Sequence, residues 1–319
     1  IPHTAQQFGR AIIMPNLKPP VTTVEMALCY RDEILQAIPE NRAFNPLMTL
    51  YLTDSTTVEE VQKAVESEFI HAFKLYPAGA TTNSQDGLTN LNAAYVIFEA
   101  MEKYDIPLLV HGEVTDDAID IFDRERVFID QKLHDIARNF PGLRIVLEHI
   151  TTIEAIEFVL DSSEYIAATI TPQHLMFNRN AILTGGIRPH HYCLPIIKRE
   201  THRQALLKAA TSGNPKFFLG TDSAPHLKRM KESTCGCAGC YSAHAAIELY
   251  TEVFESMNAL DKLEGFASFY GPDFYRLARN TTQITLEKTE WIIPKSYPMV
   301  LDCIVPLKAG EKCDWKLVV

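Results

Sequence analysis

The chain has 319 residues, 46% of them hydrophobic, so it is long enough to bury a large core in a single domain. Its formal net charge of -10 and pI near 5.6 argue against binding to nucleic acid or anionic membrane, because both need concentrated positive charge. No apolar stretch approaches the roughly 20 residues of a membrane span, and no secretory signal opens the sequence. An odd number of cysteines without a signal favours a cytoplasmic setting.

Short apolar segments alternate with amphipathic segments along most of the chain. The predicted strands are 10–17, 46–52, 70–76, 106–112, 144–150, 166–171 and 216–222. The predicted helices are 21–38, with Thr22 or Thr23 as its N-cap, 56–68, 90–104, 117–139, 152–161 and 201–212. This alternation is typical of parallel βαβ units.

Seven strands are one fewer than a closed (β/α)8 barrel needs. We therefore predict an α/β fold of the TIM-barrel type that lacks its first strand in this chain and forms one domain over residues 1–319. A barrel without one strand has two unpaired edges, so we favour a first strand ahead of Ile1 in the complete protein. The loops 77–89, 172–200 and 223–241 are long enough to be functional, and residues 285–319 predict a small accessory sheet.

Four of the predicted strands end in a residue that can bind a metal or titrate: Lys74, His111, His149 and Asp222. The intervals between them are 37, 38 and 73 residues, and the last is close to twice the others. A regular period with a polar residue at each strand end indicates a repeated strand-helix unit. In a barrel these strand ends form the rim that carries the chemistry.

The residue types at this rim allow more than one chemistry. Lys74 can act as a Schiff-base nucleophile, as in an aldolase, or it can be carboxylated and bridge two metal ions. His111 and His149 favour the metal, because histidine is the commonest metal ligand. Asp222 can ligate a metal and exchange a proton with its bound water. Taken singly, each histidine is more often structural, and Asp222 is a possible cap.

Three cysteines form a second cluster, Cys235, Cys237 and Cys240. A structural zinc site normally has four ligands in two distant pairs, and the chain has no second CxxC motif. We therefore interpret the cluster as a tight glycine-rich loop after the strand that ends at Asp222.

Several long motifs resemble the dihydroorotases of the compact, single-function type, within the amidohydrolase superfamily. They are MPNLKPPVTT at 14–23, FKLYPAGATTNS at 73–84, LLVHGEVTD at 108–116, LEHITT at 147–152, ATITPQHLMFNRN at 168–180, RPHHYCLPIIKR at 188–199 and GTDSAPHLKRMKESTCGCAGC at 220–240. The resemblance runs from about Gly9 to at least residue 275. It implies reversible, zinc-dependent ring closure of N-carbamoyl-L-aspartate to L-dihydroorotate in pyrimidine biosynthesis, by a cytoplasmic homodimer.

The resemblance also implies roles for the strand-end residues. A carboxylated Lys74 is expected to bridge two zinc ions, with His111 and His149 on the more exposed ion and Asp222 on the buried one. In the hydrolytic direction, Asp222 is expected to take the proton of the attacking hydroxide and deliver it to the leaving nitrogen. Cobalt or manganese would also suit these ligands.

The implied substrate contacts lie in the long loops. Asn16 and His226 match residues that hold the substrate carboxylate, and the backbones of Leu194 and Ala238 match positions that bind the polar edge of the ring. Thr81 and Thr82 match a loop that closes over bound substrate. These expectations describe a protein that acts on a small molecule.

The sequence departs from the family at its beginning. Dihydroorotases carry a His-x-His pair and a closely following Arg on the first barrel strand, and this chain has neither. The lone His3 precedes what aligns with the second strand and cannot stand in for the pair. A noncatalytic barrel that serves as a scaffold is therefore one alternative. Another cyclic amidohydrolase, such as a hydantoinase, is a second.

Overall fold

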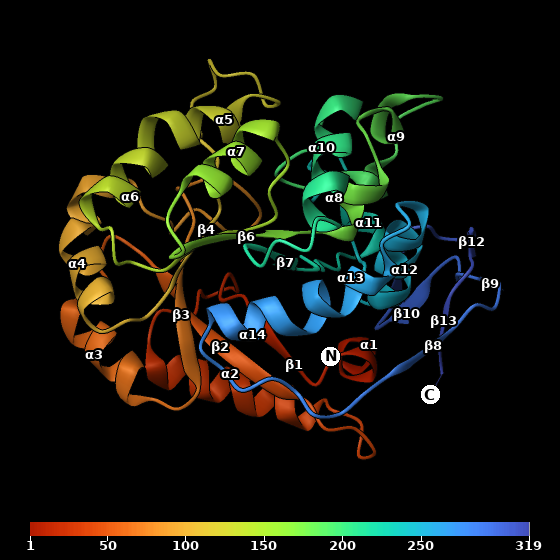
Figure 1. Ribbon diagram of the computed structural model, residues 1–319, viewed down its shortest axis with the longest axis horizontal. Helices are drawn as coiled ribbons and strands as arrows, with labels where there is room; N and C mark the ends of the chain where they lie inside the picture. The colour runs from red at the N-terminus through yellow and green to blue at the C-terminus, as the bar shows by residue number, and fades with distance from the viewer. Residues whose placement is uncertain (319) are drawn as a thin grey trace. The chain divides into compact units, whose positions relative to one another are not determined.

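The computed structural model describes residues 1–318 (Figure 1). Its largest sheet has seven strands, and their order across the sheet is their order along the chain. The pairs from β1 to β6 are parallel, which confirms the predicted parallel α/β fold with seven strands. The strands are β1 (Arg10–Ile13), β2 (Asn45–Leu52), β3 (Ile70–Leu75), β4 (Leu108–Val110), β5 (Ile145–Leu147), β6 (Ile166–Ile170) and β7 (Phe217–Leu219).

The chain divides into two compact units. The first comprises Ile1–Glu148, Glu157–Ala168 and Phe274–Arg276, and the second comprises His149–Ile156, Thr169–Asp273 and the residues from Leu277 onward. Each unit has its own buried apolar side chains, with Leu50 and Phe73 in the first and Phe217 and Phe254 in the second. Strand β6 begins in the first unit and ends in the second.

In the first unit, amphipathic helices follow the strands. Figure 1 shows α2, α3 and α4 along one side of β1 to β3. The side chain of Thr23 caps α2 by accepting a hydrogen bond of 3.3 Å from the backbone N–H of Met26, which confirms the predicted cap. The helices are α1 (Pro2–Gln7), α2 (Val24–Gln36), α3 (Val58–Glu66), η1 (Leu91–Ala94), α4 (Tyr95–Lys103), α5 (Arg124–Phe128), η2 (Ile129–Leu133), α6 (His134–Asn139) and the last part of α7 (Ile153–Asp161).

The second unit contains the remaining helices and the C-terminal strands. Its helices are α8 (Pro172–Met176), α9 (Asn180–Leu183), η3 (Pro189–His191), α10 (Glu200–Ala210), α11 (Lys228–Lys231), α12 (Ala246–Ser256), α13 (Leu260–Glu264), η4 (Gly265–Phe269) and most of α14 (Tyr270–Phe274). The later strands pair antiparallel as β8 (Thr285–Glu287) with β13 (Lys316–Val318), β9 (Trp291–Ile292) with β12 (Lys312–Cys313), and β10 (Tyr297–Met299) with β11 (Asp302–Ile304).

Several predicted elements differ from the structure, and the predicted loop 223–241 contains the short helix α11. The first strand ends at Ile13 because Pro15 has no N–H to donate to a neighbouring strand. The predicted helix 117–139 begins only at Arg124, since Asp116 and Asp120 accept hydrogen bonds from backbone N–H groups two residues on and hold turns there. Residues 172–200 include three short helices rather than an extended loop, and residues 285–318 form three two-stranded sheets rather than one.

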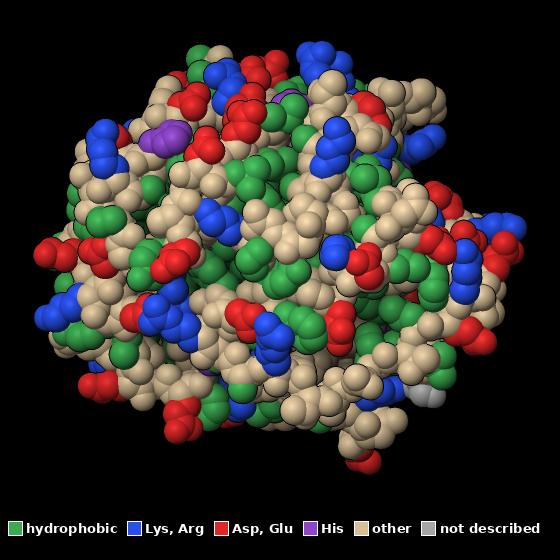
Figure 2. Space-filling model, viewed as in Figure 1, with side chains coloured by type: hydrophobic (Ala, Val, Ile, Leu, Met, Phe, Trp, Pro, Cys, Tyr) green, Lys and Arg blue, Asp and Glu red, His purple; other side chains and the backbone are tan. Residues whose placement is uncertain are grey.

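The surface agrees with the charge balance of the sequence. On the face shown in Figure 2, acidic and basic side chains are interspersed, without a broad basic patch. Over residues 1–318, no helix is both long and apolar enough to cross a membrane.

Candidate active site

Lys74 and His111 occupy neighbouring strand ends in the first unit. Lys74 lies within the apolar strand β3 and is 1% exposed, while His111 directly follows β4 and is equally buried. The backbone N–H of His111 donates to the carbonyl of Leu75 at 3.0 Å, which aligns the two strand ends. The Tyr76 ring contacts both side chains, with its centroid 5.0 Å from Lys74 Nζ and 6.0 Å from the imidazole centroid. Lys74 and His111 therefore lie close together.

A buried hydrogen bond of His111 determines which of its ring nitrogens carries the proton. Its Nε2 lies 2.8 Å from Oε2 of Glu113, and both side chains are at most 2% exposed. A carboxylate can only accept, so Nε2 carries the proton and Nδ1 keeps its lone pair. Metal-binding histidines typically donate their second ring N–H to a carboxylate in this way. The donor set in this unit therefore fits a metal ion bound through Nδ1.

The predicted substrate residues of the first unit also meet. Asn16 Nδ2 donates to the carbonyl of Thr82 at 3.2 Å, and Asn83 Nδ2 donates back to the carbonyl of Asn16 at 3.1 Å. Thr81 closes a tight turn, because its N–H donates to Ser84 Oγ at 2.8 Å and its carbonyl accepts from the same hydroxyl at 2.6 Å. Two hydrogen bonds thus join the segment after β1 to the loop after β3.

Two tyrosines connect this loop to the strand-end residues. The Tyr51 ring stacks on the Tyr76 ring with 5.1 Å between centroids, and the Tyr51 hydroxyl lies 3.5 Å from the carbonyl of Asn83. Burial, together with the charge of Asp86, raises the pKa of Tyr51 well above its usual range, so the hydroxyl stays protonated as a donor. The first unit therefore contains one continuous group that runs from Lys74 to Asn16.

In the second unit, His149 and Asp222 follow the ends of β5 and β7 and share an uncommon backbone conformation. Their φ angles are +46° and +42°, in the left-handed region that costs energy for residues other than glycine. The backbone N–H of His149 donates to Thr169 Oγ1 at 2.7 Å. A Cβ on Gly220 would lie 2.6 Å from Cβ of Thr169, so only glycine allows this approach. Thr169 on β6 therefore lies against both strand ends.

His226 and Ala238 are also in contact. His226 Nε2 lies 3.0 Å from the carbonyl of Ala238, and since a carbonyl only accepts, Nε2 is the donor. Burial and the charge of Lys231 lower the pKa of His226, partly opposed by this hydrogen bond. The N–H of Gly239 donates to the carbonyl of Tyr192 at 2.9 Å, which joins the cysteine-rich turn to the segment that contains Leu194.

The buried side chain of His174 binds the segment that contains Leu194. Its Nε2 lies 2.9 Å from the carbonyl of Pro195 and its Nδ1 lies 2.7 Å from the hydroxyl of Thr171. The side chain is 2% exposed, and burial lowers its pKa to about 3. A neutral imidazole therefore anchors the backbone next to Leu194.

The predicted residues thus form two groups, one in each unit. Among residues 1–318, no group of three or more His, Cys, Asp or Glu side chains is arranged to hold a metal ion without a lysine.

The cysteines of the predicted turn differ in environment, since Cys235 is exposed and Cys240 is buried with its thiol 3.5 Å from the carbonyl of His190.

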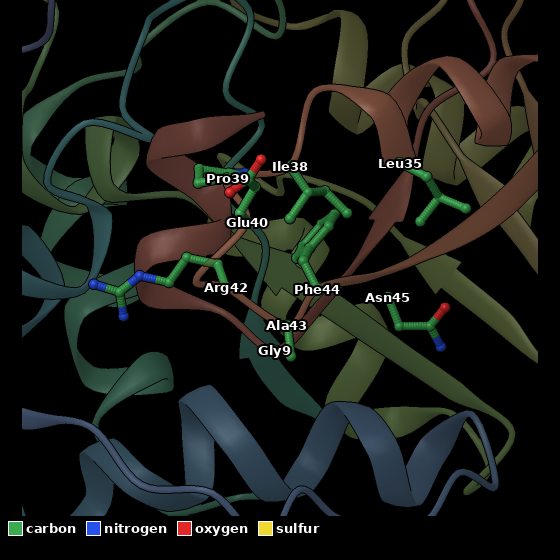
Figure 3. A pocket seen from close by; sticks show the side chains of 9 residues that line it. All are labelled: Gly9, Leu35, Ile38, Pro39, Glu40, Arg42, Ala43, Phe44 and Asn45. Atoms are coloured by element: carbon green, nitrogen blue, oxygen red, sulfur yellow. The ribbon is translucent and has the colours of Figure 1, made fainter.

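A hollow of about 500 Å³ lies elsewhere in the first unit, at the amino ends of β1 and β2 (Figure 3). None of the predicted site residues lines it. Lys74, by contrast, lies near the carboxyl end of β3. The lining residues are Gly9, Leu35, Ile38, Pro39, Glu40, Arg42, Ala43, Phe44 and Asn45.

Sequence reasoning missed several residues of these groups. Glu113 could have been suspected, because it is a charged residue two positions after His111 at a strand end. Thr169 and Tyr76 had no distinguishing signal, since threonine and tyrosine are ordinary strand residues. Lys231 lies in a run with Lys228 and Arg229 that reads as a solvated surface, yet it is only 3% exposed.

The amidohydrolase family model matches residues 1–297 of the chain. The chain therefore belongs to the amidohydrolase family. A dihydroorotase from Picosynechococcus sp. is 65% identical over 316 residues, which cover 99% of this chain and 91% of that protein. Within the family, this chain accordingly groups with the dihydroorotases, hydrolases that act on cyclic amides and are generally metal-dependent.

Solved structures agree with this assignment. The dihydroorotase of Saccharomyces cerevisiae in complex with 5-fluoroorotic acid has a TM-score of 0.91 and 34% identity, over 99% of this chain and 92% of that one. The dihydroorotase of Campylobacter jejuni has a TM-score of 0.90 and 36% identity, over 99% of this chain and 90% of that one. An L-hydantoinase from Arthrobacter aurescens has a TM-score of 0.80 but only 15% identity, over 98% of this chain and 76% of that one, so it shares the fold alone.

Proposed function

We propose that this chain catalyses the reversible ring closure of N-carbamoyl-L-aspartate to L-dihydroorotate with two zinc ions. The observation that carries the proposal is the burial of Lys74 at 1% exposure in an apolar strand, beside a histidine whose Nε2 is held by a carboxylate. A buried lysine ammonium is costly, whereas carboxylation converts it into an anion that metal ions neutralise.

The roles proposed for the metal-binding residues are those that the resemblance to dihydroorotases implies, and they suit the residue types. Carboxylated Lys74 would bridge the two ions, His111 and His149 would bind one of them, and Asp222 would bind the other. When bound, zinc polarises the amide carbonyl and lowers the pKa of water. In the hydrolytic direction, the Asp222 carboxylate would accept the proton of the attacking water and return it to the ring nitrogen as the C–N bond breaks, which is general base and then general acid catalysis. The strained φ of +42° at Asp222 supports this role, because such strain concentrates at functional sites.

The substrate contacts are assigned to the segment after β1 and the loop after β3 in the first unit, and to the segment with Leu194 and the loop after β7 in the second. Asn16 and His226 would hold the substrate carboxylate, and the backbones of Leu194 and Ala238 would bind the polar edge of the ring. Thr81 and Thr82 would close over the substrate. Their loop is joined to Asn16 by two hydrogen bonds, one donated by each side-chain amide. We further propose that the protein works in the cytoplasm as a homodimer.

Assay of the complete protein with zinc tests this function. We expect ring opening of L-dihydroorotate, ring closure of N-carbamoyl-L-aspartate, and no comparable turnover of a neutral hydantoin. Turnover of the hydantoin without turnover of dihydroorotate would replace this function with that of a hydantoinase. Absence of both activities in a zinc-loaded protein would favour the noncatalytic scaffold.

The variant Lys74→Ala tests the bridging role. It should abolish turnover and lower the zinc content measured by elemental analysis, because it removes a ligand shared by both ions. Lys308→Ala is the matched control, since Lys308 Nζ contacts Glu252 at 2.7 Å near the C-terminus and is assigned no part in binding. Two tightly bound zinc ions and normal turnover in Lys74→Ala would exclude the bridge. Trapping of a substrate on Lys74 by borohydride would instead support an aldolase.

A further inference from the structure

Lys231 is a buried residue, and among residues 1–318 the hydrogen bonds of its ammonium group go to main-chain carbonyls. It ends the short helix α11 and is 3% exposed. Its Nζ lies 2.7 Å from each of three carbonyl oxygens, those of Tyr192, Cys237 and Gly239. A lysine ammonium has three donors, so all three are used, and each bond is a short, charge-assisted one.

These three carbonyls come from two separate segments of the second unit. Tyr192 belongs to the segment before Leu194, and its carbonyl also accepts the N–H of Gly239 at 2.9 Å. Cys237 and Gly239 directly flank Ala238 in the glycine-rich turn. One ammonium group therefore fixes the backbone around both Leu194 and Ala238, which are the two main-chain positions assigned to the ring of the substrate.

The bond to Cys237 has a further effect on Ala238. The carbonyl of Cys237 and the N–H of Ala238 belong to the same peptide group. A cation bound to the carbonyl oxygen polarises that group, and hydrogen-bond chains strengthen one another in this way in a low-dielectric interior. Lys231 thus sets the direction of the Ala238 N–H and strengthens it as a donor.

We propose that Lys231 is a positioning residue that holds and polarises the main-chain groups of the substrate-binding turn for the ring edge of dihydroorotate. The inference rests on the proposed function, because it needs the ring edge to lie at Leu194 and Ala238. Lys231 itself touches neither the reacting bond nor a metal ligand in this assignment, so its contribution is to substrate affinity rather than to the chemical step.

Replacement of the ammonium group should separate KM from kcat. In Lys231→Met, which keeps an unbranched side chain up to the Cε position but has no terminal donor or charge, we expect KM for dihydroorotate to rise about tenfold or more, the equivalent of one charged hydrogen bond. The kcat and the zinc content should stay within about threefold, because Lys231 touches neither the reacting bond nor a metal ligand in this assignment. The control Lys308→Met removes a different lysine that pairs with Glu252, and it should leave KM unchanged.

The outcomes distinguish this inference from the function beneath it. An active wild type with an unchanged KM in Lys231→Met overturns the inference and leaves the function intact. A fall in kcat at unchanged KM overturns it too, because that result would make Lys231 part of the chemical step. A wild type with no turnover of dihydroorotate removes both. If Lys231→Met does not fold, Lys231→Gln has two N–H donors for three carbonyls, and the same rise in KM at retained kcat is required of it.

Discussion

His111 and Glu113 are joined by a buried hydrogen bond of 2.8 Å between Nε2 and Oε2. The second carboxylate oxygen of Glu113, Oε1, has no hydrogen-bond partner among the described residues. The hydrogen bond of this carboxylate therefore goes to His111, and it selects the tautomer whose Nδ1 can bind a metal.

Glu113→Gln is expected to weaken zinc binding about 10- to 100-fold, because an amide can place either an N–H or an oxygen against Nε2 and no longer selects the tautomer. Competition with a chelator measures the affinity, and the absorption spectrum of the cobalt-substituted protein reports the ligand geometry. Glu102→Gln is a suitable control, since Glu102 Oε1 accepts the N–H of Gly142 at 2.6 Å and has no part in the proposed site. Equal zinc affinity in the two variants would refute the role of Glu113.

Asp222→Asn should lower kcat about 100- to 10,000-fold, because an amide cannot carry the proton from water to the leaving nitrogen. The dissociation constant of dihydroorotate should change far less. Single-turnover kinetics and equilibrium binding separate the two effects, with zinc content measured in parallel. Asp302→Asn, which alters a surface carboxylate paired with Arg229, provides the comparison. Loss of binding in proportion to the loss of kcat would speak against the proton-transfer role.

Asn16→Ala should raise KM about fivefold to tenfold, since it removes the hydrogen bond to the Thr82 carbonyl and the proposed contact to the substrate carboxylate. Steady-state kinetics in both reaction directions check this expectation. The exposed residue Asn92, changed to alanine, controls for loss of an asparagine. If KM were unaffected, neither Asn16 nor its tie to the loop would contribute to substrate binding.

His174 makes the stability of the protein depend on pH in a defined direction. Burial lowers its pKa from 6.5 to about 3, so the unfolded chain binds more protons than the folded one between these values. The stability that neutral His174 contributes is complete above pH 6.5 and is lost as the pH falls toward 3. Within this window, the free energy of unfolding should fall by about 1.4 kcal/mol per pH unit more than in His174→Gln. Denaturant titrations at several pH values provide the test, and parallel slopes for the two proteins would contradict it.

Much of the fold was predictable because the sheet is parallel. Buried parallel strands read as short apolar runs, and the seven runs correspond to β1 to β7. The pairing of Lys74 with His111 followed from the same pattern, because consecutive strand ends lie side by side. Helix ends were less predictable, and at Asp116 and Asp120 the side chains compete with the helix for backbone N–H groups.

The supporting residues of the site could not be predicted in the same way. The partners of Lys231 include a carbonyl 39 residues away, and only the folded loops determine that approach. Gly220 similarly shows no pattern in sequence, although the side chain of Thr169 leaves no room for a Cβ there. Such contacts depend on tertiary geometry, which neither periodicity nor residue type encodes.

The order of the strands also bears on how the chain acquires its structure during synthesis. Because the sheet follows the sequence without rearrangement, every strand from β2 onward finds its partner in the segment made just before it. Assembly strand by strand suits growth from the N-terminus as the ribosome releases the chain, because each parallel pairing closes only the one strand-helix crossover before it. The strands that carry Lys74 and His111 would then be paired while the segments with His149 and Asp222 are still being translated.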